Sequence, residues 1–248
     1  MTYAGTSGAV ITLRGVTRDL GEGENRVQVL KGIDLNIRQG EFCAIVGPSG
    51  SGKSTLMYLL GALDRPTGGR VEISGADTAK LVDDDLAELR NRKLGFIFQF
   101  HYLMPEFSAL ENVMMPMLKL GTQRTEAVAR AQFLLAELGL GEKAGRPPGR
   151  LSGGEQQRVA IARALANEPL VVLGDEPSGN LDTQNADRVF GIFERLVKEH
   201  NQTIVVVTHD PDMAARTNRV IRIVDGRIVQ DGPAPGAPHQ RPEGAMAG

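Results

Sequence analysis

The stretch Gly47-Pro-Ser-Gly-Ser-Gly-Lys-Ser-Thr55 follows a short apolar run, Phe42-Cys-Ala-Ile-Val46. It fits the G-x-x-x-x-G-K-[S/T] pattern of a phosphate-binding loop, between a predicted strand and a predicted helix from about Lys53 to Leu63. Lys53 would bind the β- and γ-phosphates of a nucleotide, and the hydroxyl of Ser54 would be a ligand of Mg²⁺. A glycine-rich turn with a chance lysine accounts less well for the strand and the full spacing together. The predicted phosphate-binding residues are Gly47, Ser49, Gly50, Ser51, Gly52, Lys53, Ser54 and Thr55.

Composition excludes several classes of protein. The 248 residues are 41% hydrophobic, enough for a substantial core, and 28 Lys and Arg against 30 Asp and Glu give a net charge of −2. This balance offers no bulk electrostatic attraction for nucleic acid. The single cysteine, Cys43, cannot form an internal disulfide, so we expect a reducing compartment and a buried thiol. No signal peptide and no apolar run near the ~18 residues of a membrane span is evident, so any work at a membrane would need a partner.

Apolar patterning predicts an α/β protein. Unbroken β-branched runs at Leu170–Leu173 and Thr203–Val207 are typical of parallel strands covered on both faces. Strand-like patterns also occur near residues 10–13, 27–30 and 94–98, and residues 220–230 suggest a hairpin turning at Asp225-Gly226. Helical patterns cover residues 83–90, 109–120, 125–138 and 155–167. From Asp231 the chain is rich in Pro, Gly and Ala, and we expect a disordered tail.

Two carboxylates end the first of these buried strands, in Leu173-Gly-Asp-Glu176. Ligands of open α/β sheets bind at this strand edge, so Asp175 could hold Mg²⁺ and Glu176 could accept a proton from an attacking water. Strand ends are often acidic, however, and the pair by itself leaves a solvated turn equally open.

Leu151-Ser-Gly-Gly-Glu155 opens a predicted helix. Ser152 and Glu155 fit the S-x-x-E capping box, for which the two glycines would be permissive spacers. The glycines also leave the helix amides accessible, so this N-terminus could bind a phosphate. The two interpretations are compatible, because a capping serine does not prevent a phosphate contact.

Together these motifs resemble the ABC-type ATPases over roughly residues 10–232. The matching segments, in the family's order, are the phosphate loop, a Q-loop glutamine at Gln99, the signature Leu151–Glu155, the carboxylates Asp175 and Glu176, the D-loop Ser178–Asp182, and a switch histidine at His209. This order of six motifs favours the catalytic interpretation of the carboxylate pair.

The resemblance implies a P-loop NTPase of the α/β class, with a mainly parallel core sheet, an N-terminal antiparallel β subdomain and an inserted α-helical subdomain. The whole would form one ATPase domain over residues 1–232. Residues 9–98 and 168–232 would form the nucleotide-binding core with the β subdomain, residues 99–167 the helical subdomain, and residues 233–248 a disordered tail.

The resemblance also implies a head-to-tail homodimer in which each ATP lies between the phosphate loop of one copy and the signature of the other. The signature residues would be Ser152, Gly153, Gly154 and Glu155. Mg²⁺ would be held by Ser54, Gln99 and Asp175. Glu176 and His209 would be catalytic, with His209 on the γ-phosphate, and Asp182 would act in the D-loop. On its own, a histidine at a strand end would more often be structural.

One position departs from the family pattern. An aromatic ring usually follows the first strand and stacks on adenine, whereas Leu20 occupies the aligned position here. We therefore assign no adenine-stacking residue.

Aromatic residues cluster between Phe96 and Phe107. Phe96 and Phe98 are predicted to be strand core, whereas residues 100–107 suit either a protein interface or a loop folded over its own core. Here the sequence most resembles the ATPases of lipoprotein-releasing complexes (the LolD group), with MacB-type exporter domains and FtsE-type cell-division ATPases as relatives.

That resemblance implies integral inner-membrane partners of the LolC/LolE type, attachment to the cytoplasmic face of the inner membrane, and lipoprotein release without direct contact with the transported substrate. A soluble, non-transport ABC ATPase acting on ribosomes or DNA is the alternative from another class. It fits less well, because the chain has a single phosphate loop and no long coiled coil or zinc-binding cysteines.

Overall fold

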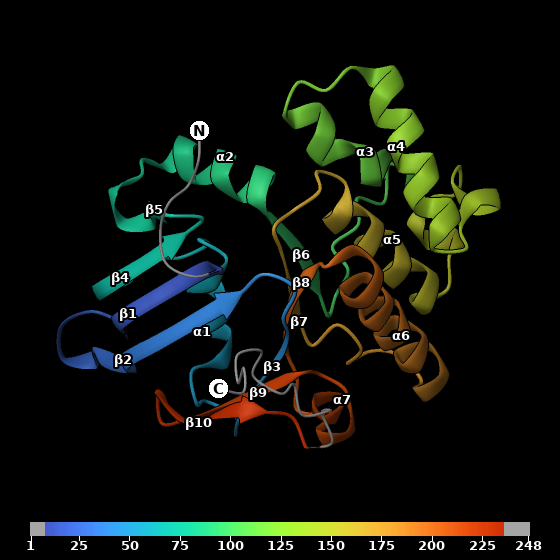
Figure 1. Cartoon of the computed structure of the whole chain (residues 1–248). Coiled ribbons are helices and arrows are strands. Elements are labelled where there is room, and N and C mark those ends of the chain that lie inside the picture. The colour runs from blue at the N-terminus through green and yellow to red at the C-terminus, as the bar shows by residue number, and fades with distance from the viewer. Residues whose placement is uncertain (1–7, 236–248) are drawn as a thin grey trace, which may run out of the picture.

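The computed structural model describes residues 8–235, arranged as two sheets with helices around them (Figure 1). The strands are β1 (Ala9–Leu20), β2 (Val27–Arg38), β3 (Phe42–Val46), β4 (Gly68–Ile73), β5 (Ala76–Asp77), β6 (Leu94–Phe98), β7 (Val171–Asp175), β8 (Thr203–Val207), β9 (Arg219–Val224) and β10 (Arg227–Pro233). The helices are α1 (Lys53–Leu60), α2 (Asp83–Lys93), α3 (Ala109–Lys119), α4 (Arg124–Glu137), α5 (Gly153–Leu165), α6 (Thr183–His200) and α7 (Pro211–Ala215).

The larger sheet has the strand order β10-β9-β3-β8-β7-β6, and only β10 pairs antiparallel. The smaller sheet, β2-β1-β4-β5, is antiparallel. In the parallel register Ile45 pairs with Val207, and Val207 pairs with Asp175. The end of β7 therefore lies two strands from the start of the phosphate loop. The α/β class and the combination of a parallel core sheet with an antiparallel sheet are confirmed.

Alternation along β3 divides the core between two faces. Phe42 and Ala44 join the cluster that includes α3, α4, α5 and α6, and the Phe42 ring lies 6.2 Å from both Phe190 and Phe193. Cys43 and Ile45 join the cluster formed with α1 and the antiparallel sheet. The predicted burial of Cys43 is confirmed, and burial raises the pKa of its thiol.

Two expectations were wrong, one about the core and one about the start of the C-terminal tail. Phe96 and Phe98 are only half-buried, because both line an open groove between β6 and the neighbouring helices. The chain also stays ordered past residue 232: Pro233 belongs to β10, and Ala234 is buried with its N–H donated to Asn218 O. The rest of the expected tail, residues 236–248, lies outside the described residues.

Element boundaries mostly follow the predictions. The hairpin turns at Asp225 and Gly226, both with positive φ, as predicted. Helix α1 is shorter than expected, because Gly61 forms its C-cap. Within residues 8–235, no helix combines the length and apolar character needed to cross a membrane.

Candidate nucleotide-binding and hydrolysis site

The phosphate loop joins β3 to α1 and ends at Gly52, the N-cap of α1. Gly52 has φ +101°, and a Cβ there would lie 2.8 Å from Cδ2 of the buried Leu30 and 3.3 Å from Val29 O. Both the backbone conformation and the close packing therefore require glycine. No side chain caps α1, and its first turn contains no acidic residue. The first amides of the helix are thus left for an anion.

Lys53 and Ser51 are the polar side chains whose surroundings distinguish the loop. Lys53 Nζ donates to Gly47 O at 3.0 Å and to Pro48 O at 2.9 Å, which holds the ammonium over the loop. Ser51 Oγ is buried and has no hydrogen-bond partner among the described residues. Gly226 N donates to Ser51 O at 3.1 Å, so the β9–β10 turn braces the loop. An unpartnered buried hydroxyl beside a lysine fits an anionic ligand.

The carboxylates at the end of β7 face the same edge of the sheet. Burial raises the pKa of Asp175 and repulsion from Glu176 adds to it, while Lys53 acts in the opposite direction. The strand register also places Asp175 level with Val207 and Ile45, at the edge of the sheet where the phosphate loop begins. Glu176 has φ +45° and donates its N–H to Val207 O at 2.9 Å. His209 Nδ1 lies 3.1 Å from Glu176 Oε1. The structure thus brings Asp175, Glu176 and His209 together near the phosphate loop.

Gln99 follows β6 and contacts the D-loop of the same chain. Its Nε2 donates to Asn180 Oδ1 at 3.1 Å, and Asn180 Nδ2 donates to Gln99 O at 3.1 Å. Gln99 Oε1 makes no hydrogen bond within residues 8–235. This oxygen remains available as a ligand. The contribution of Asn180 was missed, because 81 residues separate the pair and no sequence pattern links them.

The signature segment lies apart from the phosphate loop. In the described part of the chain, no hydrogen bond joins residues 152–155 to residues 47–55. The predicted capping box is confirmed: Ser152 Oγ accepts from Glu155 N, and Glu155 Oε2 accepts from Ser152 N. Lys143 also bonds the Glu155 carboxylate, and these contacts lower the pKa of Glu155. The capping box does not use the N–H groups of Gly153 and Gly154.

Asp182, the predicted D-loop residue, is the N-cap of α6. Its side chain accepts from Asn185 N at 2.8 Å and from Asn185 Nδ2 at 2.7 Å, and these bonds lower the pKa of Asp182. Nearby, Gln157 of α5 donates to Pro177 O at 2.6 Å. The signature helix is therefore bonded to the residue that directly precedes the D-loop in the same chain.

Two further residues near Gln99 were not predicted. His101 Nε2 lies 3.1 Å from Gly153 O, and Arg163 donates to the carbonyl oxygens of His101 and Tyr102, each at 2.6 Å. Arg163 is a half-buried cation in a helix whose neighbouring positions are apolar or alanine, and burial lowers the pKa of its guanidinium. The signal in the sequence that could have found this contact is an arginine among apolar and alanine positions of a predicted helix.

Comparisons with known proteins agree with this geometry. The ABC transporter family model matches residues 30–179. A lipoprotein-releasing system ATP-binding protein, LolD, of Geobacter metallireducens is 51% identical over 90% of this chain and 99% of its own length. A macrolide export ATP-binding/permease protein, MacB, of Paracoccus denitrificans is 52% identical over 92% of this chain and 34% of its own length.

A solved structure gives the same result for the fold. A dimeric ATP-binding cassette in a post-hydrolysis state, bound to ADP and Pi, superposes with a TM-score of 0.83 at 41% identity, covering 91% of this chain and 99% of that chain. The chain therefore belongs to the ABC transporter family and is an ATPase of that family.

Proposed function

We propose that this chain is the ATP-hydrolysing subunit of a transporter that releases lipoproteins from the inner membrane towards the outer membrane. It would act as a peripheral subunit on the cytoplasmic face, with integral partners of the LolC/LolE type. The observation that carries this proposal is the 51% identity to the LolD protein over nearly the whole of that relative. Macrolide export is the second candidate, because the MacB relative is 52% identical.

In this proposal the phosphate loop holds ATP with Mg²⁺. The hydroxyl of Ser54, the carboxylate of Asp175 and the free Oε1 of Gln99 supply hard oxygen ligands, and the nucleotide phosphates supply the others. Among the described residues, no group of three or more His, Cys, Asp and Glu side chains could hold a metal alone. A metal site shared with phosphates is consistent with that finding. Bound Mg²⁺ would neutralise charge that develops on the transferring phosphoryl group.

Glu176 is the proposed general base for the attacking water, and His209 would contact the γ-phosphate. Their 3.1 Å contact supports a joint position at the phosphate end of the nucleotide. Ser152, Gly153, Gly154 and Glu155 would complete the site from a second copy, with Asp182 at the same interface. The separation of the signature from the phosphate loop within one chain supports this shared arrangement, as does the dimeric state of the solved relative. Hydrolysis would then depend on dimerisation.

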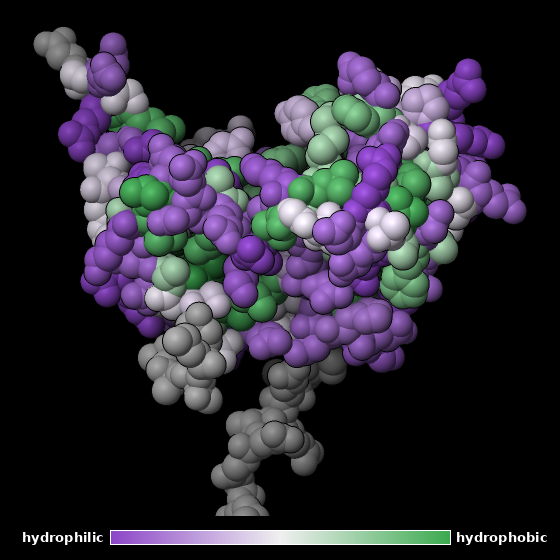
Figure 2. Space-filling view, turned by 90° about the horizontal axis from the view of Figure 1, so that it is seen from above, coloured by the Kyte–Doolittle hydropathy of each residue, from purple (hydrophilic) through white to green (hydrophobic). Residues whose placement is uncertain are grey.

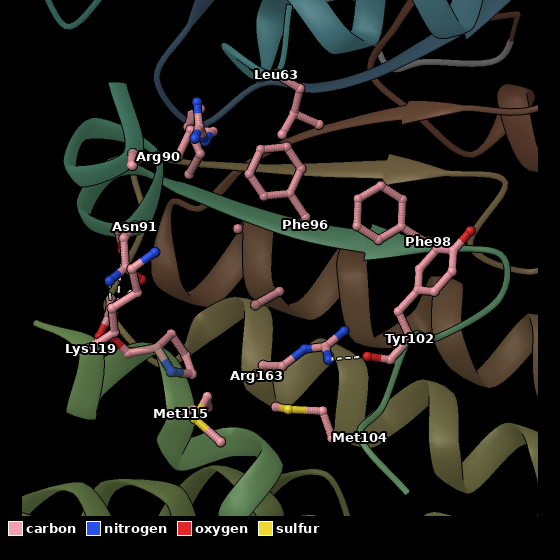
Figure 3. Close-up of a pocket in the computed structure, with 16 residues that line it drawn as sticks. Leu63, Arg90, Asn91, Phe96, Phe98, Tyr102, Met104, Met115, Lys119 and Arg163 are labelled. Carbon is pink, nitrogen blue, oxygen red and sulfur yellow. Dashed lines mark hydrogen bonds between the residues drawn. The ribbon is translucent and has the colours of Figure 1, made fainter. Parts of the chain in front are cut away.

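The groove beside Gln99 is the proposed docking site for the membrane partner. It is a cavity of about 460 Å³ between β6, α2, α3 and α5, and Figure 3 shows Phe96, Phe98, Tyr102, Met104 and Met115 around it. The Phe98 and Tyr102 rings meet edge to face at 5.4 Å. Figure 2 shows the molecule from above in the orientation of Figure 1. On this face, hydrophobic side chains lie among polar ones.

The charges that line the groove indicate the chemistry of a partner segment that would bind there. The groove is lined by three cations, Arg90, Lys119 and Arg163, and by no carboxylate. Tyr102, which lines the groove, is 65% exposed, and Phe100, two residues before it in the chain, is 64% exposed. A partner segment that carries both apolar and acidic side chains would complement this surface. The exposure of these rings favours an interface over a loop folded on its own core.

The test uses the assembled complex with its co-purified membrane subunits. We expect Phe100→Glu to lower the stimulation of ATPase activity by those subunits about tenfold, because it removes an aromatic anchor and adds a charge that repels acidic partner groups. Phe133→Glu is the matched control, since Phe133 is an exposed ring on α4 outside the groove, and it should retain stimulation. Equal stimulation of the Phe100 variant and the wild type would refute the docking site. Stimulation by a macrolide and not by an acylated protein would favour the second candidate.

A further inference from the structure

The backbone after Gln99 is bonded to α5 at two places. The ring of His101 contacts Gly153 O in the first turn, whereas the carbonyl of His101 accepts from Arg163, ten residues further along the helix. Tyr102 O accepts from the same guanidinium, as the dashed line in Figure 3 shows. A single residue, His101, therefore links the groove margin to the N-terminal end of the signature helix.

The intrinsic conformational preference of tyrosine does not explain the backbone conformation at Tyr102. Tyr102 has φ +47°, a conformation that costs a non-glycine residue free energy. Charge-assisted hydrogen bonds from Arg163 to two successive carbonyls offset that cost. The position of the His101 ring is thus imposed by α5 and not by the loop alone.

The contact at Gly153 has a geometric consequence. The carbonyl of Gly153 and the N–H of Gly154 belong to one peptide group, which is planar. A hydrogen bond that fixes the direction of Gly153 O therefore also fixes the direction of Gly154 N–H. Within the described residues that N–H has no hydrogen-bond partner, while the capping box already satisfies the N–H groups of Ser152 and Glu155.

We infer that His101 is a positioning residue for ATP hydrolysis: through Gly153 O it sets the direction of the Gly154 N–H towards the ATP bound by a second copy. This inference rests on the shared site of the proposed function. It also gives a direct route from the groove to that site, because a partner that shifts residues 101 and 102 turns the peptide group between Gly153 and Gly154.

The experiment measures ATP-dependent dimerisation of the full chain by analytical ultracentrifugation. The parent is Glu176→Gln, in which loss of the proposed general base is expected to slow hydrolysis. On this parent, His101→Asn keeps a residue that tolerates left-handed backbone, but its amide is too short to reach Gly153 O. His101→Gln places an N–H donor at about the position of Nε2. We expect His101→Asn to weaken the dimer about tenfold or more, since two equivalent sites each lose a hydrogen bond, and His101→Gln to restore most of the affinity.

Two controls distinguish the loss of this positioning contact from a general loss of folding or of ATP binding. ATP affinity of the monomer should be unchanged in both variants, and His200→Asn, an exposed histidine at the end of α6, should dimerise like the parent. Dimerisation of the His101→Asn variant at parental strength, or an equal loss in His101→Gln, would overturn the inference. A parent that stays monomeric with ATP would instead refute the shared site, and the inference with it.

Discussion

The N-termini of α1 and α5 both present backbone amides, but they are built in opposite ways. Helix α1 starts at a glycine with no side-chain cap and no acid in its first turn, whereas α5 starts with a complete capping box and a carboxylate. The uncapped end leaves its amides and its positive dipole entirely to an anion. The capped end is already stable and keeps only the amides of Gly153 and Gly154 free. This difference fits the proposed roles, in which α1 binds the phosphates of its own nucleotide and α5 completes the site of a second copy.

The largest expected effect would come from breaking α1 at its cap. Gly52→Ala forces a Cβ against Leu30 and a side chain into φ +101°, so we expect ATP affinity of the monomer to fall on the order of tenfold to a hundredfold. Gly153→Ala is the matched control on α5, because its Cβ would meet only Leu181 Cδ2 at 3.9 Å. Calorimetric titration of both variants tests the contrast. Equal ATP affinities of the two variants would contradict it.

A smaller effect concerns what holds the nucleotide besides α1. Leu20 is 42% exposed and pairs across the hairpin with Val27, which is 61% exposed, so the pair offers apolar surface without an aromatic plane. Leu20→Tyr should strengthen ATP binding about fivefold or more by adding a base stack of at least ~1 kcal/mol. The same titration measures it. An unchanged or weaker dissociation constant would show that the phosphate end alone sets the affinity.

The smallest effect would come from opening the capping box of α5. Ser152→Ala should lower the melting temperature by about 2–4 °C, since loss of a cap costs ~1 kcal/mol. Ser108→Ala removes the equivalent box of α3 and should lower it by the same amount. Only the Ser152 change should also weaken the ATP-dependent dimer on the Glu176→Gln parent. Loss of the dimer in both variants would mean that the N-terminus of α5 contributes no more to dimerisation than that of α3.

Most of the site was predictable where its atoms come from one short stretch. Nine consecutive residues, with a strand before and a helix after, determine the phosphate loop, and the S-x-x-E spacing determines the cap of α5. The contacts of Gln99 with Asn180 and of His101 with Gly153 join residues 81 and 52 positions apart. The first contact depends on the pairing of β6 with β7, and the second depends on how α5 packs against β6; no local pattern encodes either.

The errors in the predicted core have the same origin. Alternation along β6 shows that Phe96 and Phe98 share a face, but it does not show whether another element covers that face. Here the groove leaves it open, so Phe96 and Phe98, which were expected in the core, line a cavity instead. At the end of β10, pairing with β9 keeps Pro233 in the sheet although the sequence there is rich in Pro and Gly.

The buried thiol of Cys43 has a practical consequence for studying this molecule. It is the only cysteine in the chain, it is fully buried, and its raised pKa disfavours the reactive thiolate. A cysteine introduced at an exposed position such as Val229 would therefore be the one thiol that reagents reach quickly in the folded protein. Spectroscopic labels could then be attached site by site without first removing a native residue, and distances between two copies could be followed through the ATP cycle.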